Sequence, residues 1–390
     1  MIRLMKNSFY NEASTKTALV DFITKATRFS MGEQCAQFEK NFAKWQGRQH
    51  ALFVMNGSMA NLVLIQSLMN MGHLSPGDKV GFSAVTWSTN IMPIIQLGLV
   101  PIPVDCEINT LNISSEELQK TIDSNPLKAL FITNALGFAS DIDKIAEICE
   151  ANNIILIEDN CESLGSEIKG KKLGNFGLAS TFSTFVGHHM STIEGGIICT
   201  DDEELYAHLV MCRAHGWDRN LNPEQQQALR KKENVDDFFS TYTFHELAYN
   251  ARPTEIQGFL GSIQLQYLDE IVAKREENFN RFQEALPLDK VFSIDVKHMS
   301  LVSNFAMPII CKNKEIFKDL TAKFRAAEIE IRPVIAGNML RQPFYRKHVK
   351  ESFELPNSNY IHDHGFYFGN HPDLTEAEIN ILAETLSSPL

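Results

Sequence analysis

Short apolar runs alternate with longer amphipathic segments along the chain from about residue 50. The run ALFVM (51–55) predicts a buried strand, NGS (56–58) interrupts it, and residues 59–72 have the spacing of a helix. Strand and helix signals then recur in KVGFSAV (79–85) with NIMPIIQLG (90–98), VPIPVDC (100–106) with SSEELQKTI (114–122), ALFITNA (129–135) with DIDKIAEICEANN (141–153), and IILIEDN (154–160). This alternation indicates a mostly parallel sheet that helices cover on both faces.

The rhythm changes after residue 160. We expect a polar hairpin at SEIKGKKLG (166–174) and two further strands at ASTFST (179–184) and GGIICT (195–200). Residues 217–245 predict a long loop or flap, of which 220–238 is the clearest part. A helical stretch follows over residues 256–286, and a smaller α+β unit begins at SNFAMPIIC (303–311). A chain of 390 residues exceeds one compact core. We therefore predict a large α/β domain with an N-terminal arm over 1–285 and a small domain over 286–390.

Composition and charge narrow the class of protein. Apolar residues make up 44% of the chain and the formal charge is −12, which argues against a nucleic-acid surface but allows a small anionic ligand. The seven cysteines are scattered singly, so neither a disulfide framework nor a zinc or iron–sulfur site is indicated. Neither a signal peptide nor an apolar run of about 18 residues is visible, so we expect a cytoplasmic protein without a membrane span.

The glycine-rich segments give weak nucleotide signals. The dinucleotide fingerprint G-x-G-x-x-G is absent, and GSEIKGKK (165–172) imitates a phosphate loop without the serine or threonine that should follow its lysine. A surface hairpin is the better interpretation of that segment. Gly57 and Ser58 lie between a predicted strand and helix, where free N–H groups can bind an anion, although any tight turn uses the same residues.

Two strand ends carry polar side chains. Asp159 ends a buried strand at the edge where open α/β sheets bind ligands, and its alternative role is to cap the next helix. Ser183 ends another strand and can hold a phosphate oxygen or a backbone amide.

The segment TFVGHHMSTIEGG (184–196) then sets two imidazoles, His188 and His189, before a glycine pair, and no lysine occurs between residues 173 and 212. Adjacent side chains of an extended segment point to opposite sides, so the pair predicts no metal site.

Together these residues resemble the pyridoxal-phosphate enzymes of the aspartate aminotransferase fold (fold type I), in the sugar-nucleotide aminotransferase branch. That branch has a strand of the form F-S-F, then a lysine, and E-G-G six residues after the lysine. Phe182, Ser183 and Glu194 to Gly196 match these places, and the register puts His188 where the lysine belongs. A histidine there is the mark of a lysine-less subgroup, the 3-dehydratases of GDP-linked 4-keto-6-deoxy-mannose in the colitose pathway. The resemblance extends over NGSMANL (56–62), VTWSTN (85–90), LIEDNCESLG (156–165), RAHGWDRN (213–220), YNARP (249–253), IEIRPV (329–334) and FGNH (368–371).

The resemblance implies a fold, a cofactor site and a substrate site. The fold would have a mostly parallel, seven-stranded central sheet flanked by helices and a smaller α+β C-terminal domain. His188 would be the catalytic base, and the non-covalent cofactor, pyridoxal or pyridoxamine phosphate, would contact Gly57, Ser58, Trp87, Asp159, Glu162, Ser183 and Asn250. The GDP-linked sugar would contact Thr27, Arg28, Phe29, Ser30, Arg219 and Arg332, and the carboxylate of L-glutamate would contact His215 and Arg252. Asn250 and Arg252 would reach a neighbouring subunit of a homodimer.

The replacement of lysine by histidine has a chemical meaning. An imidazole is not a primary amine, so it cannot hold the cofactor covalently, and the aminated cofactor is free to condense with the sugar ketone. An imidazole with a pKa near 6.5 can take the C4′ proton and return it, whereas a lysine amine titrates about four units higher. The resemblance implies loss of the 3-hydroxyl, release of ammonia in water, and re-amination of the cofactor by glutamate, for a deoxysugar of lipopolysaccharide O-antigen or capsule.

Two other functions fit the same residues. One is a sugar-nucleotide aminotransferase with a non-lysine base, which would leave an amine on the sugar instead of releasing ammonia. The other is a catalytically idle relative that only binds the cofactor or a sugar nucleotide. The sequence does not distinguish GDP from other nucleotides, or a hexose from a heptose.

Overall fold

The structure is a computed structural model that describes residues 1–387, so residues 388–390 of the predicted small domain lie outside the described residues. Its central sheet has seven strands in the order β1-β9-β8-β5-β4-β2-β3. They are β1 (His50–Val54), β2 (Lys79–Ser83), β3 (Val100–Val104), β4 (Ala129–Thr133), β5 (Ile155–Asp159), β8 (Ala179–Ser183) and β9 (Gly196–Thr200). Strand β9 is antiparallel to both neighbours, and the other pairs are parallel. The predicted mostly parallel sheet is confirmed.

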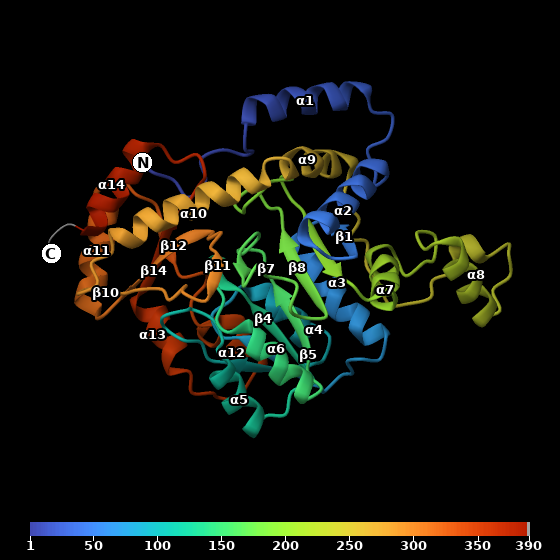
Figure 1. The fold of residues 1–390 in the computed structure, drawn as a ribbon. Coiled ribbons are helices and arrows are strands. Elements are labelled where there is room, and N and C mark those ends of the chain that lie inside the picture. The colour runs from blue at the N-terminus through green and yellow to red at the C-terminus, as the bar shows by residue number, and fades with distance from the viewer. Residues whose placement is uncertain (388–390) are drawn as a thin grey trace.

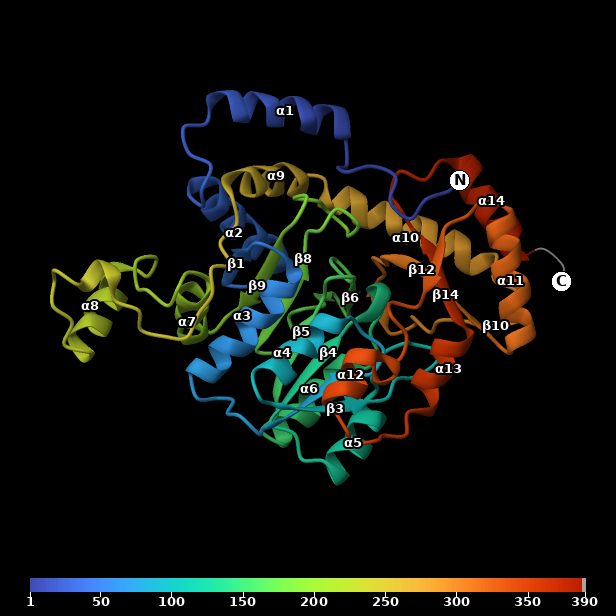
Figure 2. The same ribbon diagram turned by 180° about the vertical axis from the view of Figure 1, so that it is seen from behind.

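Helices cover both faces of this sheet (Figures 1 and 2). One face packs on α3 (Gly57–Asn70), α4 (Met92–Gln96) and α7 (Glu203–Arg213), and the other on α5 (Ser115–Ser124) and α6 (Ile142–Ala151). Successive residues of β4 alternate between these two cores: Phe131 belongs to the first, and Leu130 and Ile132 belong to the second. Both faces are apolar, which is why the strands appear in the sequence as continuous hydrophobic runs.

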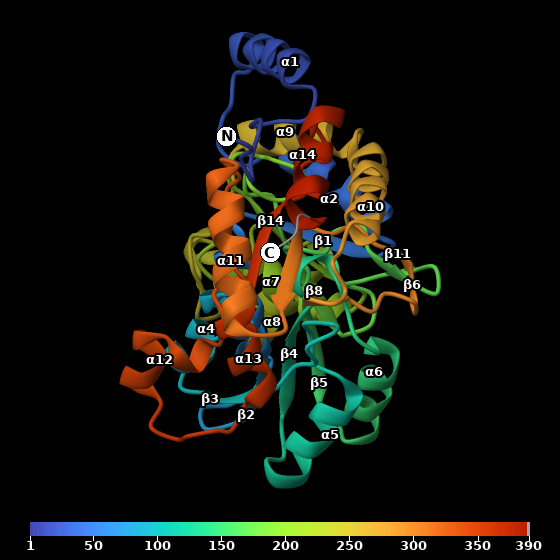
Figure 3. The same ribbon diagram turned by 90° about the vertical axis from the view of Figure 1, so that its left-hand side faces the viewer.

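The N-terminal third adds two helices that the sequence pattern did not predict, α1 (Glu12–Lys25) and α2 (Glu33–Gln46). Helix α2 buries Phe38 and Phe42 against the β1 edge of the sheet and packs on α9 (Glu255–Leu265). Helix α1 lies on the outer side of α9, at the top of Figures 1 and 3. Thr15 is its buried residue, so most of its surface faces outward.

The C-terminal third forms an antiparallel sheet of four strands in the order β10-β12-β14-β13. Its elements are β10 (Val291–Phe292), β12 (Ala306–Cys311), α11 (Lys314–Ala326), β13 (Ile331–Pro333), α12 (Pro343–His348), α13 (Pro356–His364), β14 (Gly365–Gly369) and α14 (Glu376–Ser387). Helix α10 (Leu268–Glu284) leads into this sheet. The amino terminus lies here too, because Ile2 bridges to Ile329 and joins the same core. The boundary at residues 285/286 stays a prediction.

The remaining elements correct the sequence reading in two places. The predicted loop over 220–238 is wrong in part, because α8 (Pro223–Lys232) forms there; Asn222 caps it and Gln225 completes a capping box. The helical stretch over 256–286 divides into α9 and α10 at Gln266. The predicted hairpin is confirmed as β6 (Glu167–Ile168) and β7 (Lys171–Lys172), with β11 (Met299–Leu301) beside it. The short 3₁₀ turns of the described chain are η1 (Ser88–Asn90), η2 (Ala135–Gly137), η3 (Ser240–Tyr242) and η4 (Met339–Arg341). Over residues 1–387, every helix is too short or too polar to cross a bilayer.

Candidate active site

A cavity of about 510 Å³ lies at the carboxyl-terminal edge of the central sheet. The last residues of three parallel strands line it: Thr133 of β4, Asp159 of β5 and Ser183 of β8. The four-stranded C-terminal sheet lines the opposite side of the cavity with Arg332 of β13 and Tyr367 of β14. A ligand in this cavity would therefore contact both sheets, at the edge where parallel α/β sheets bind ligands.

One end of the cavity has the features of a phosphate site. Helix α3 begins at Gly57, and the side chain of its N-cap Asn56 accepts a hydrogen bond from Met59 N, which leaves earlier N–H groups free. A Cβ on Gly57 would lie 2.9 Å from Cβ of Ser183, so only glycine lets the start of the helix approach that serine so closely. Gly57, Ser58 and Ser183 thus form a small polar cradle that fits a phosphate group.

The carboxylate of Asp159 is held by three donors. Asn61 and Asn90 donate to Oδ2 at 3.0 and 2.7 Å, and the backbone N–H of Cys161 donates to Oδ1 at 2.9 Å. No helix begins immediately after β5, so the alternative role of Asp159 as a helix cap is wrong. The sequence reading did not assign Asn61 or Asn90, although both lie in segments that carried the resemblance. An oriented carboxylate in this position fits a protonated ring nitrogen.

Glu162 lies in the same cavity as a second carboxyl group. Its Oε2 accepts a hydrogen bond from Leu136 N at 2.9 Å. Burial, reinforced by the negative charge of Asp159, raises the pKa of Glu162 to about 7, despite that hydrogen bond. Glu162 is therefore able to carry a proton near neutral pH.

His188 lies at the tip of the hairpin that joins β8 to β9. The hairpin is closed by Thr192 N to Thr184 O at 2.9 Å and by His188 N to Phe185 O at 2.8 Å. The imidazole packs edge-on between Phe185 and Phe305, with ring centroids 6.0 and 5.4 Å away. Desolvation lowers the pKa of His188 to about 4. The negative charge of Asp159 opposes this shift, and the positive charge of Arg275 adds to it. The imidazole is neutral at physiological pH and can accept a proton.

His189 does not share this environment. It is buried, and its Nε2 lies 2.9 Å from Ser303 O, away from the cavity lining. The two imidazoles separate as the sequence predicted. Within residues 1–387 no group of three or more His, Cys, Asp or Glu side chains is arranged to hold a metal ion.

The cations of the cavity wall are arginines. Among the described residues that line the cavity, Arg275 and Arg332 carry positive charge and no lysine is present. Trp87 lies at the same wall with 55% of its surface exposed, so its ring is accessible for stacking. The cavity thus combines a phosphate cradle, an oriented carboxylate, an exposed aromatic ring and a neutral base, without an amine that could form a covalent adduct.

Comparison with known proteins agrees with this arrangement. The model of the DegT/DnrJ/EryC1/StrS aminotransferase family matches residues 11–387. The chain belongs to this family. Its fold is that of the pyridoxal-phosphate-dependent aminotransferases, as the sequence predicted.

Some relatives within the DegT/DnrJ/EryC1/StrS family are named for a dehydration. The chain is 38% identical to the GDP-4-keto-6-deoxy-D-mannose 3-dehydratase of Yersinia pseudotuberculosis, over 92% of each chain. It is 37% identical to the enzyme of the same name from Escherichia coli O55:H7, over 94% of this chain and 95% of that one. A crystal structure of such a dehydratase with a trapped PLP–glutamate geminal diamine has a TM-score of 0.89 and 34% identity, over 99% of this chain and 100% of the other.

The cavity brings together half of the residues that the family resemblance suggested. They are Gly57, Ser58, Trp87, Asp159, Glu162, Ser183, His188 and Arg332. A second group lies apart from the cavity, around Trp217: the ring of His215 lies 4.8 Å away, and the guanidinium groups of Arg219 and Arg252 lie 4.0 and 5.7 Å from the indole. Asn250 belongs to this group, because its Oδ1 accepts from Arg252 Nε at 2.9 Å.

A third group lies in the connection between α1 and α2. Arg28 donates to Ser30 Oγ at 3.2 Å and to Met31 O at 2.6 Å, and Phe29 is 42% exposed. Thr27 is exposed as well. None of residues 27–30 lines the cavity of this chain, so their predicted contact with the sugar nucleotide stays a prediction.

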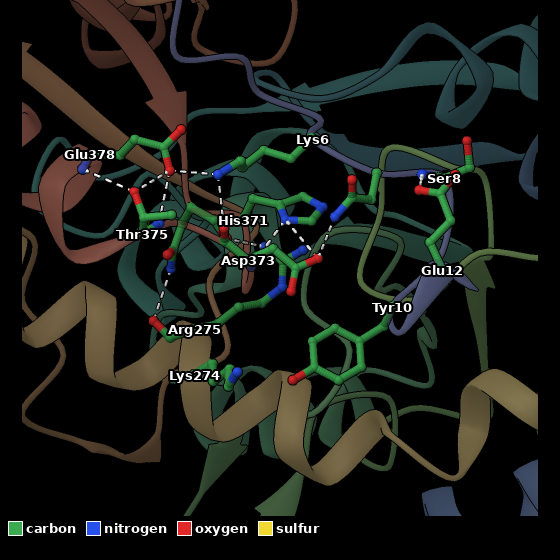
Figure 4. A network of polar contacts seen from close by, with 12 residues as sticks. Lys6, Ser8, Tyr10, Glu12, Lys274, Arg275, His371, Asp373, Thr375 and Glu378 are labelled. Carbon is green, nitrogen blue, oxygen red and sulfur yellow. Dashed lines mark hydrogen bonds and ion pairs between the residues drawn. The ribbon is translucent and has the colours of Figure 1, made fainter. Parts of the chain in front are cut away.

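The amino-terminal segment contributes to the cavity wall through Leu4 and Met5, which the sequence analysis missed. Leu4 N donates to Glu330 Oε2 at 3.0 Å, and the other oxygen of Glu330 accepts from Arg332 Nη2 at 2.8 Å. Lys6, the next residue of this segment, anchors it to the loop before α14, as Figure 4 shows. Its Nζ donates to Asp373 O at 2.8 Å and pairs with Glu378. Only tertiary contacts identify these residues as part of the site, because more than 300 positions separate them from their partners.

Proposed function

We propose that the chain is a dehydratase that uses pyridoxamine phosphate to remove the C3 hydroxyl from a GDP-linked 4-keto-6-deoxy sugar of the mannose type. The observation that carries the proposal is the neutral imidazole of His188, in one cavity with Asp159 and Ser183 and without a lysine among the described lining residues. The dehydration for which the Yersinia and Escherichia relatives are named supports it. The deoxygenated sugar would serve in a surface polysaccharide.

The residues of the cavity fit this cofactor. Gly57, Ser58 and Ser183 would hold its phosphate, Asp159 would pair with its ring nitrogen, and Trp87 would stack on the ring. When bound, the aminated cofactor supplies a primary amine that can react with a ketone and a pyridine ring that accepts electrons. The donors from Asn61 and Asn90 keep the Asp159 carboxylate in place, so a proton on the ring nitrogen is favoured.

His188 would move the protons of the reaction. Its neutral ring accepts a proton when a C–H bond is broken and returns it to the departing hydroxyl or to carbon. Since an imidazole forms no stable covalent adduct with the cofactor, the cofactor stays exchangeable and L-glutamate would re-aminate it in the same cavity. The sugar product would leave and shed ammonia, and glutamate would leave as 2-oxoglutarate.

The substrate contacts outside the cavity would come from a second copy of the chain. We propose a homodimer in which Asn250 reaches the partner's phosphate cradle, His215 and Arg252 bind the glutamate carboxylate, and Arg219 joins Arg332 and residues 27–30 at the sugar nucleotide. Exposed apolar side chains around the Trp217 group support such an interface, because large exposed apolar patches mark association surfaces. They are Phe238, Phe239, Tyr242, Phe244 and Leu247.

A single assay tests the reaction. The protein is incubated with pyridoxal phosphate, L-glutamate and GDP-4-keto-6-deoxymannose, and ammonia, 2-oxoglutarate and the sugar product are measured. We expect equal amounts of ammonia and 2-oxoglutarate, and a sugar that has lost its 3-hydroxyl and carries no amine. An aminated sugar without ammonia would identify an aminotransferase instead, and the absence of 2-oxoglutarate would identify a protein that only binds. Running dTDP- and CDP-linked 4-keto sugars in parallel tests the choice of nucleotide.

A further inference from the structure

Arg275 of α10 is a buried, positively charged residue that lines the cavity. The proposed function assigns it neither a cofactor contact nor a substrate contact. Its side chain and backbone are 2% exposed. Its Nη1 donates to the backbone carbonyls of Phe305 and Asn370 at 3.0 and 2.6 Å, with a longer contact of 3.4 Å to Asn304. Its Nε has no hydrogen-bond partner within the described residues. Figure 4 places Arg275 beside the loop that carries His371 and Asp373.

This environment is unusual for a guanidinium. Buried charges are normally paired with an opposite charge, because removing an ion from water without such a partner is costly. Within the described residues, carbonyl oxygens accept the hydrogen bonds of this side chain. Burial lowers the pKa of Arg275 to about 9, against the opposing effect of the Asp373 carboxylate. An apolar residue could fill the same space without this cost, which suggests that the charge has a function.

Two of the carbonyl groups that accept from Arg275 belong to residues 304 and 305, in the segment that packs against His188. Phe305, whose carbonyl accepts from Arg275, places its ring against the imidazole of His188 with centroids 5.4 Å apart. Ser303, at the start of the same segment, accepts the Nε2 contact of His189 at 2.9 Å. The Nδ1 of His188 itself has no hydrogen-bond partner within the described residues. Packing on the 303–305 segment, and not a hydrogen bond, therefore positions the catalytic ring.

The charge of Arg275 also acts on this ring. Of the groups that share the cavity with it, Asp159 favours the imidazolium form of His188 and Arg275 opposes it. The other titratable or charged groups that line the cavity are Glu194 of the same hairpin, Cys161, Glu162, Arg332 and Tyr367. The neighbouring His189 lies outside this lining, with its Nε2 against Ser303 O. A permanent positive charge near an imidazole disfavours a second one.

We propose that Arg275 is a positioning residue for the reaction, which fixes the 303–305 segment behind His188 and keeps a positive charge beside that ring. The inference deepens the proposed function and rests on it for the identity of the base. Two substitutions separate the two effects. Arg275→Met removes the charge and the hydrogen bonds, whereas Phe305→Leu keeps the charge and removes the ring that backs His188. Arg281→Met, on the exposed side of the same helix, is the matched control, because among residues 1–387 Arg281 pairs with Glu376 and Asn380, far from the cavity lining.

The experiment uses the full-length holoenzyme and two readouts. The first is the conversion of bound pyridoxal phosphate by glutamate, followed by absorbance across pH, which needs no sugar. The second is the NMR titration of the His188 ring, assigned by comparison with His188→Asn. We expect Arg275→Met to raise the titration midpoint of His188 by about half a pH unit or more. It should also lower the rate constant at saturating glutamate about tenfold or more, with a KM for glutamate within about threefold of wild type.

The other variants make the outcome decisive. Arg275→Lys should leave the midpoint near that of wild type, and Phe305→Leu should lower the rate constant without moving the midpoint. An unchanged midpoint in Arg275→Met would overturn the electrostatic role, and a raised KM with an unchanged rate constant would identify Arg275 as a ligand-binding residue instead. If Arg275→Met does not fold, Arg275→Gln takes its place and the same midpoint decides. A failure of sugar dehydration alone would count against the proposed function and leave this inference standing, because both readouts work without sugar.

Discussion

The side-chain amide of Asn90 donates to Oδ2 of Asp159 at 2.7 Å, while its own Oδ1 accepts from Thr86 Oγ1 at 3.0 Å. The amide is thereby fixed in one orientation, since turning it over would break both hydrogen bonds. The carboxylate that faces the cavity is thus oriented by a residue 69 positions earlier in the chain. Thr86 is held in turn by Thr133 Oγ1 at 2.6 Å, so the ends of β4 and β5 and the segment after β2 share one polar network.

Asn90→Ala should weaken cofactor binding more than it weakens the fold. Loss of one donor to a buried carboxylate costs about 1–3 kcal/mol, which corresponds to roughly 5- to 150-fold in affinity if it falls entirely on the cofactor complex. A fluorescence titration with pyridoxal phosphate measures the change. Asn152→Ala, an exposed asparagine at the end of α6, is the control. Equal affinities of Asn90→Ala and wild type would show that Asp159 does not bind the ring nitrogen.

His188→Asn should preserve the fold and the binding of the cofactor but abolish turnover. Asparagine fills a similar volume and cannot exchange protons near neutral pH, so we expect a loss of at least about 100-fold in kcat for both half-reactions. Circular dichroism and a cofactor titration check the fold and the binding, and 2-oxoglutarate formation checks the first half-reaction. Turnover within a few-fold of wild type would assign the base to another residue.

Borohydride should leave the cofactor of the wild-type protein free. Reduction traps a cofactor only where an amine has formed an imine with it, and no lysine lies among the described residues of the cavity wall. His188→Lys restores an amine at the hairpin tip and should become labelled on reduction. Intact-mass spectrometry distinguishes the two, and labelling of the wild-type chain at any residue of the cavity would contradict the proposal.

The stability difference between wild type and Glu162→Gln should depend on pH. Its pKa is raised from 4.5 to about 7 in the folded protein, mainly by burial, so the folded state favours the protonated form. The associated stability is fully present below about pH 4.5 and is lost as the pH rises through about 7. Glu162→Gln, which mimics the neutral form, should therefore gain in Tm relative to wild type between these pH values. The Tm values are measured on cofactor-free protein, and Glu147→Gln, at an exposed position, is the control. A Tm difference between Glu162→Gln and wild type that stays the same at every pH would contradict the prediction.

Mixed dimers test the proposed sharing of the site. Arg252 lies outside the cavity of its own chain, whereas His188 lies inside it. If Arg252 serves the partner's cavity, a hybrid of Arg252→Ala and His188→Asn subunits contains one intact site. Random exchange of two inactive homodimers would then restore about a quarter of wild-type activity, because half of the dimers are hybrids with one working site. Absence of recovery after verified subunit exchange would argue that each chain completes its own site.

Local patterns accounted for the strands and helices between residues 50 and 160 because the sheet there is buried on both faces. They failed for α8, where ten mostly polar residues form a helix on the surface. The capping box of Asn222 and Gln225 with Pro223 was the available signal, but polar composition concealed it. Both α1 and α2 were missed as well, because they precede the strand–helix alternation that begins at about residue 50.

By itself, the sequence determined the chemistry at the strand ends: a carboxylate at 159, a serine at 183 and an imidazole at 188 in place of an amine. These residues lie on or next to strands whose apolar runs define where they end. Only the tertiary structure decided what surrounds them, because the strand order β1-β9-β8-β5-β4-β2-β3 does not follow the chain. Leu4, Asn90 and Arg275 reach the cavity, and Asn61 reaches Asp159, through contacts between distant segments, and no local periodicity encodes such contacts.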